Sequence, residues 1–163
     1  MESSKTPPSV ELWCRFDVPP VVQRTRSTVC DRLRTLQSEG MIDEVSVNRW
    51  GSFLYLREGP VLSGSDPARD AFRAFERWAS EYGFELEPAF ERYDDTRLAR
   101  NDHERLCDGT YSPTSTQVIR LPIMSLAIYE GERLVGVAPS SDGSQTYTVT
   151  EGLEVLEGKQ QFI

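Results

Sequence analysis

The first regular element of this chain is predicted to be a β-strand, because apolar and polar residues alternate over residues 10–17. One face carries Val10, Leu12, Cys14 and Phe16, and the other carries Glu11, Trp13, Arg15 and Asp17. A period of two is typical of a strand with one buried face. The pair Pro19-Pro20 then ends the strand, since proline cannot donate a hydrogen bond to a sheet. The first helix of the chain therefore has to follow a strand.

A helix is predicted over residues 21–39. Its apolar stripe recurs at helical spacing and consists of Val22, Val29, Leu33 and Leu36. Gly40 suits the left-handed position after a helix, and Met41 is placed to contact Leu36 in a Schellman-type end. Val45 and Val47 then belong to a second strand, which Trp50-Gly51-Ser52 interrupts before an apolar run over 53–56. The predicted order over residues 10–50 is β-α-β.

The remainder of the chain adds two helices and several strands. Asp66-Pro67 is a typical helix start, and Gly83 ends that helix. Residues 84–90 are typical of an edge strand because they contain Pro88, and residues 94–117 show no clear period. Residues 118–129 are apolar on both faces, which predicts one central strand, with a hairpin partner over 134–138. A capping box over 148–151 opens a last helix that runs through about residue 157.

These elements predict an α+β fold with a single domain. We expect a two-layer sandwich, with helices on one face of a mainly antiparallel sheet, and a ferredoxin-like order is the specific arrangement considered. Residues 1–9 are polar and contain Pro7-Pro8, so they are expected to form a disordered tail. The domain then covers residues 10–163.

The charge composition restricts the partners. The chain has 18 Lys and Arg against 26 Asp and Glu, a net charge of −8, so a surface that is basic as a whole is excluded, whereas a local basic face is not. Sixteen of the basic residues are Arg, which is typical of a cytosol of near-molar salt or of a GC-rich genome. No apolar run is long enough to span a membrane, and the first residues lack the apolar core of a signal peptide. We expect a cytoplasmic protein without membrane contact.

Candidate catalytic and metal sites are weak. The cysteines Cys14, Cys30 and Cys107 form no CxxC pair and are expected to be reduced thiols. His103 and Cys107 lie one helical turn apart and could join the other two cysteines around zinc, but Cys14 and Cys30 fit small core residues better. The chain has no nucleophile elbow, Walker loop or GxGxxG motif, and its acids over 94–108 fit a solvated surface. We expect no enzyme activity, no cofactor and no metal.

Residues 26–42 resemble the recognition helix of winged helix-turn-helix regulators. They have Ser and Thr near the start, Leu-x-x-Leu, and then Gly and an apolar pair, and residues 45–56 would form the wing hairpin. Such a helix directs Arg24, Arg26 and Arg34 toward phosphates or base edges. Residues 21–40 carry four arginines against two acids, a net charge of +2. The alternative is an ordinary β-α-β unit, because the two helices that precede a recognition helix do not fit before residue 21.

Five motifs span most of residues 10–157. They are Val47-Asn-Arg-Trp50-Gly51, Phe75-x-x-Trp78-Ala79, Leu86-Glu87-Pro88-x-Phe90, Leu121-Pro-Ile-Met-Ser-Leu-Ala-Ile-Tyr-Glu130, and Ser141-Asp-Gly with Tyr147-Thr-Val-Thr-Glu-Gly-Leu-Glu-Val-Leu-Glu157. Together they resemble a family of small, largely uncharacterised haloarchaeal proteins that carry a helix-turn-helix-like label. The resemblance implies a cytoplasmic haloarchaeal protein with a regulatory role, and it brings no catalytic residues.

Two functions follow from the sequence. The first is a non-enzymatic transcriptional regulator that contacts DNA through Arg24, Arg26 and Arg34. The second is an interaction module without DNA contact, which binds a protein partner, a second copy of the chain or a small ligand through its sheet or through residues 94–117. The two are distinguished by whether the three arginines are exposed on one face of the helix or are paired with acids against the sheet.

Overall fold

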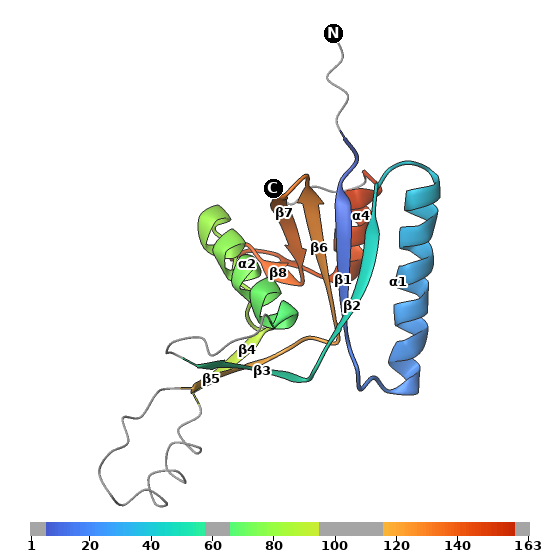
Figure 1. The fold of residues 1–163 in the computed structure, drawn as a ribbon. Coiled ribbons are helices and arrows are strands. Elements are labelled where there is room, and N and C mark those ends of the chain that lie inside the picture. Colours follow the sequence, from blue (N-terminus) through green and yellow to red (C-terminus); the bar gives the residue numbers. More distant parts are fainter. Residues whose placement is uncertain (1–5, 58–65, 95–115, 159–163) are drawn as a thin grey trace, which may run out of the picture.

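The computed structural model describes residues 6–57, 66–94 and 116–158 of the chain (Figure 1). The elements follow one another as β1 (Ser9–Arg15), α1 (Pro20–Ser38), β2 (Val45–Trp50), β3 (Phe53–Arg57), α2 (Pro67–Tyr82), β4 (Glu91–Asp94), β5 (Thr116–Arg120), β6 (Met124–Glu130), β7 (Arg133–Ala138), β8 (Ser140–Ser141), β9 (Thr146–Tyr147) and α4 (Val149–Leu156). None of the helices in these ranges has both the length and the apolar character that crossing a lipid bilayer requires. The predicted α+β class is confirmed.

A four-stranded sheet with the strand order β2-β1-β6-β7 forms the centre of the fold. β1 pairs in parallel with β2, so that Val10 lies beside Val45, and antiparallel with β6, so that Leu12 lies beside Leu126. β6 and β7 form the predicted hairpin. A parallel pair needs a crossover connection, and α1 provides it. The β-α-β order predicted for residues 10–50 is thereby confirmed.

Helices cover both faces of this sheet (Figure 1). α1 and α4 pack on the face that carries Leu12 and Leu126, and α2 packs on the opposite face, which carries Trp13. The predicted helices on a mainly antiparallel sheet are therefore confirmed, and the structure adds a helix on the second face. The alternation over residues 10–17 assigned Trp13 to the polar face, but this side chain is only 5% exposed because it packs beneath α2. The order is not ferredoxin-like. In a ferredoxin-like fold another strand lies between the two parallel strands of the β-α-β unit, whereas here β1 and β2 are direct neighbours.

The limits of α1 follow from its local sequence. Pro20 occupies the first turn, where a missing N–H removes no helical hydrogen bond. At the other end Gly40 has a φ of +75°, and the N–H of Met41 donates to the carbonyl of Leu36 over 2.9 Å. This is the Schellman end that the sequence predicts. The buried stripe consists of Val29, Leu33 and Leu36, whereas Val22 is only half-buried.

A smaller antiparallel sheet, with the order β3-β5-β4, continues from one end of the central sheet (Figure 1). The chain passes between the two sheets twice, at residues 51–52 and at residues 121–123. The two passages are joined by hydrogen bonds. The indole N–H of Trp50 donates to the carbonyl of Pro122 (3.1 Å), and the N–H of Leu121 donates to the carbonyl of Ser52 (2.9 Å).

These passages correct two predictions. The single central strand predicted over residues 118–129 is wrong, because the run is divided into β5 and β6, which belong to different sheets. Pro122 lies at the division, where the missing N–H breaks the ladder. The wing hairpin predicted over residues 45–56 is also wrong, because β2 pairs with β1 and β3 pairs with β5.

The other two helices of the described ranges, α2 and α4, begin at their predicted caps. The Asp66 carboxylate accepts hydrogen bonds from the backbone N–H groups of Ala68 and Arg69, and the Thr148 hydroxyl accepts one from Glu151. The edge strand predicted over residues 84–90 is reduced to one isolated bridge, between Glu85 and Ser141. At the start of the chain Ser9 already belongs to β1. Residues 1–5 of the predicted tail, and most of the 94–117 segment, lie outside the described residues.

Candidate nucleic-acid interface

α1 presents a polar surface on the side away from the sheet. The exposed positions recur at helical spacing and are Arg24, Ser27, Thr28, Asp31, Arg34, Thr35 and Ser38. Three of the hydroxyls are engaged by the helix itself. Those of Thr28 and Thr35 donate to the carbonyls of Arg24 and Asp31 over 3.0 Å, and that of Ser38 donates to the carbonyl of Thr35 over 2.8 Å. The outward stripe therefore combines hydrogen-bonding groups with two arginines and one aspartate.

Arg24 is exposed near the N-terminal end of α1. The first turn contains no acidic residue, and the N-cap Pro19 provides no side-chain hydrogen bond. The positive end of the helix dipole is therefore not neutralised by a local carboxylate. Arg24 adds a full charge to that end, and within the described ranges no acidic group forms an ion pair with it.

Arg26 lies on a different side of the helix, where it is half-buried and near the Cys14 thiol of β1. The register of the parallel pair places Arg49 of β2 beside Cys14 of β1, so these two side chains share the face that α1 covers. Burial and the nearby Cys30 thiol raise the pKa of Cys14, and the guanidinium groups of Arg26 and Arg49 oppose this rise. Both arginines therefore lie near the same thiol.

Arg49 is the basic residue that the sequence reasoning missed. It is exposed on the edge strand β2 and, like Arg26, has no ion pair among the described side chains. The period-two pattern of Val45, Val47 and Arg49 indicates that the three share a face. The pattern cannot indicate that this face lies next to α1, because the position of the face depends on the pairing of β2 with β1.

Arg34 is the third predicted arginine and lies further along α1. It is exposed and forms an ion pair with Asp31 over 3.7 Å, in which both side chains are more than 70% exposed. Such a pair contributes little to stability. At about 100° per residue, Arg34 lies roughly 80° around the helix axis from Arg24 and from Arg26, which are roughly 160° apart. Arg24 and Arg34 therefore lie on the outer side of the helix, whereas Arg26 lies beside the buried stripe, and the three do not share one narrow face.

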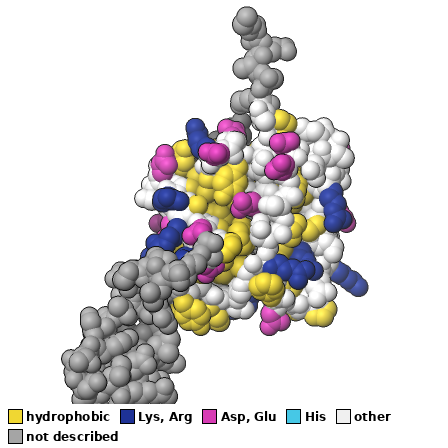
Figure 2. All heavy atoms as spheres, in the orientation of Figure 1, with side chains coloured by type: hydrophobic (Ala, Val, Ile, Leu, Met, Phe, Trp, Pro, Cys, Tyr) yellow, Lys and Arg dark blue, Asp and Glu magenta, His cyan; other side chains and the backbone are white. Residues whose placement is uncertain are grey.

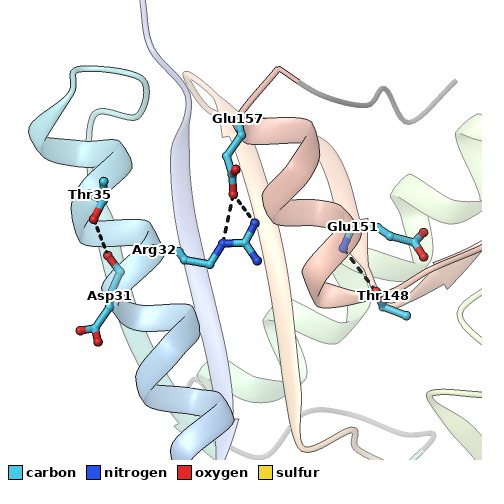
Figure 3. Close-up of polar contacts among 6 residues, drawn as sticks. All are labelled: Asp31, Arg32, Thr35, Thr148, Glu151 and Glu157. Carbon is cyan, nitrogen blue, oxygen red and sulfur yellow. Dashed lines mark hydrogen bonds and ion pairs between the residues drawn. The ribbon is translucent and has the colours of Figure 1, made fainter.

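Arg32, the remaining arginine of α1, has a structural contact (Figure 3). Its Nε donates to Oε1 of Glu157 over 3.1 Å, and its Nη2 forms an ion pair with the same oxygen. Glu157 follows α4, so this contact joins the two helices that lie on the same face of the sheet. Among the described residues, Arg32 is therefore held in a contact between helices, unlike Arg24 and Arg26.

Figure 2 shows Arg side chains at the lower right of the visible face, next to exposed hydrophobic side chains, and others at its left. Phe16 is 66% exposed, and its backbone N–H donates to the carbonyl of Trp50 over 3.0 Å, which places it at the end of β2. The exposed Phe16 therefore lies at the same end of β2 as Arg49.

The metal hypothesis rests on two thiols that the structure describes and on two residues that it does not. Cys14 is buried, Cys30 is half-buried, and both are free thiols. His103 and Cys107 lie outside the described residues. In the described part of the chain no group of three or more His, Cys, Asp and Glu side chains is placed to hold a metal ion.

The arrangement of the helices bears on the helix-turn-helix resemblance. In the ranges that the structure describes, no helix directly follows another, because α1 is followed by β2 and α2 by β4. Comparison with curated proteins and with solved structures gives no match. A family model described as a helix-turn-helix domain matches residues 2–161, which is nearly the whole chain, and the chain therefore belongs to this helix-turn-helix domain family.

Proposed function

We propose that the protein is a transcriptional regulator that binds duplex DNA through a basic surface formed by α1 and β2. The observation that carries the proposal is the set Arg24, Arg26 and Arg49, none of which has an acidic partner among the described residues. By contrast, Arg32 and Arg92 are each held in an ion pair with a glutamate. In a chain with a net charge of −8, three arginines left free on neighbouring elements favour an anionic ligand.

The geometry suits a duplex. An α-helix fits the major groove of B-DNA, and arginine forms strong bidentate contacts with phosphates and guanine. Arg34 lies ten residues beyond Arg24, about 15 Å along the helix axis. Its exposed ion pair with Asp31 is weak enough to be exchanged for a phosphate. Arg49 then contacts the backbone beside the helix.

The mode of support differs from that of a conventional recognition helix. In a helix-turn-helix unit the recognition helix is held by other helices, whereas α1 is held by Val29, Leu33 and Leu36 against the central sheet. The family membership favours DNA as the ligand, and the sheet-backed helix provides the rigid element. No catalytic step is part of this proposal.

The proposal is tested by measuring the affinity for a labelled DNA duplex by fluorescence anisotropy over a series of KCl concentrations. Each phosphate contact contributes about 0.9 to the slope of log K against log salt concentration. The variants R24A/R26A and R26A/R49A are each expected to weaken binding and to reduce this slope by about two units. The matched control is R73A/R77A, which removes two exposed arginines from α2 on the other side of the sheet.

A folding control accompanies the binding data, because Arg26 is half-buried. The melting temperature of each variant is measured, and a change in binding counts only where the variant remains folded at the assay temperature. Chromatin mapping then asks whether enriched genomic sites are lost with R24A/R26A. Equal weakening by R73A/R77A would refute the assigned surface, and the absence of a complex at every salt concentration would refute DNA binding.

A further inference from the structure

The outer face of the smaller sheet carries an exposed aromatic surface. Side chains on this face form two cross-strand rows, because the register aligns Phe53, Arg120 and Glu91 in one row and Tyr55, Val118 and Tyr93 in the next. The opposite face of the same sheet contributes Leu54, Leu56 and Ile119 to the core. The aromatic face comprises the six residues of the two rows, and it is separate from the surface of α1 and β2.

Three of these side chains are large, aromatic and exposed. Phe53 is 47% exposed, Tyr55 is 56% exposed and Tyr93 is 45% exposed, and they flank Val118, which is buried. The Tyr93 hydroxyl donates to the Glu91 carboxylate, so the aromatic and charged members of the surface are in contact. A contiguous exposed apolar patch with a polar border marks an interaction site.

The charges of the surface indicate the kind of partner. Within the six residues Arg120 and Glu91 contribute one charge of each sign, so these residues carry no net charge, whereas a surface that binds nucleic acid carries an excess of positive charge. A surface that combines both signs with aromatic side chains is instead complementary to itself. In a twofold dimer both subunits use the same patch. If one residue of the first copy contacts a second residue of the other copy, the reverse contact also forms.

We propose that two copies of this chain associate face to face through the aromatic face. The twofold axis runs parallel to the strands and passes between β5 and β4. In this arrangement the Arg120 side chain of each copy lies opposite Glu91 of the partner subunit, and Val118 lies opposite Tyr93 of the partner subunit. Phe53 and Tyr55 cover the outer edge. Aromatic and arginine side chains at the centre of such a patch are typical of protein interfaces.

The first experiment is sedimentation of the full-length protein over a concentration series, at low and at molar KCl. The protein is expected to sediment as a dimer, and Y55S/Y93S is expected to weaken dimerisation about tenfold or more, because both tyrosines lose their partner contacts. The control is Y82S, which removes an exposed tyrosine from α2 and leaves dimerisation unchanged. The melting temperatures of the monomeric forms report whether each variant is folded.

The second experiment separates contacts between copies from contacts within one copy. R120E leaves two acidic side chains in the row and E91R leaves two basic ones, so each variant alone is expected to be monomeric at low salt. An equimolar mixture of the two is expected to form a heterodimer, since every cross-copy pair is then of opposite sign. A wild-type protein that is monomeric at all concentrations, a mixture that stays monomeric, or an equal effect of Y82S overturns the proposal.

Discussion

Replacing Gly152 by Ala is expected to destabilise the protein, although alanine is the better helix former by about 1 kcal/mol. Gly152 belongs to α4, and a Cβ at this position would lie 3.0 Å from Cδ2 of Leu126 and 3.2 Å from Cβ of Ala138. Favourable carbon contacts lie at about 3.5–4.0 Å. Both neighbours are fully buried, and the Cβ of Ala138 moves only with its backbone. Overpacking of this kind costs about 2 kcal/mol, so the free energy of unfolding falls by about 1 kcal/mol.

The assay is thermal unfolding followed by circular dichroism, with an expected decrease in Tm of about 2–4 °C. The cause is tested by repeating the substitution in an L126A background, where the nearest atom is absent. There G152A is expected to be less destabilising than in the wild type, which a double-mutant cycle quantifies. If G152A raises the Tm of the otherwise wild-type protein, the reasoning is refuted, because α4 then does not lie this close to the sheet.

Two further predictions concern charge. Hydrogen bonds from the backbone N–H groups of Ser144 and Gln145 lower the pKa of Asp142, so the turn gains stability above the ordinary pKa of about 4 and loses it as the pH falls through the lower folded value. In urea unfolding, D142A is expected to be less stable than the wild type at neutral pH, with the difference shrinking below pH 4, and E132A is the control. With a net charge of −8, acidic side chains repel one another in the folded state, and salt screens this repulsion. The Tm is therefore expected to rise between dilute buffer and molar KCl, and a Tm that stays constant or falls would contradict this.

Local patterns predicted the elements of the fold well. The alternation before Pro19, the stripe of α1 and the caps at Asp66 and Thr148 each act within a few residues, and the structure confirms them. Predictions failed where a distant segment decides the outcome. Trp13 is buried because α2 covers it, and the apolar run around Pro122 is divided between two sheets because Trp50 and Ser52 hold it there.

The same distinction applies to the candidate site. Arg24, Arg26 and Arg34 could be selected from the sequence because they lie on one predicted helix, and their role remains a prediction. Arg49 could not, because its place beside Arg26 depends on the register of β2 with β1. The ion pair that removes Arg32 from the surface depends on Glu157, which lies 125 residues away in the chain.

The position of β1 between β2 and β6 has a consequence for biosynthesis. Once Trp50 has left the ribosome, β1, α1 and β2 can assemble, but the other edge of β1 has to await β6, which ends about 80 residues later at Glu130. At a translation rate of about 5–20 residues per second, that edge stays open for about 4–16 s. During this interval the nascent chain exposes a strand edge that other nascent chains can pair with. The exposure of this edge to other chains therefore ends only when β6, in the last quarter of the sequence, has been synthesised and has paired with β1.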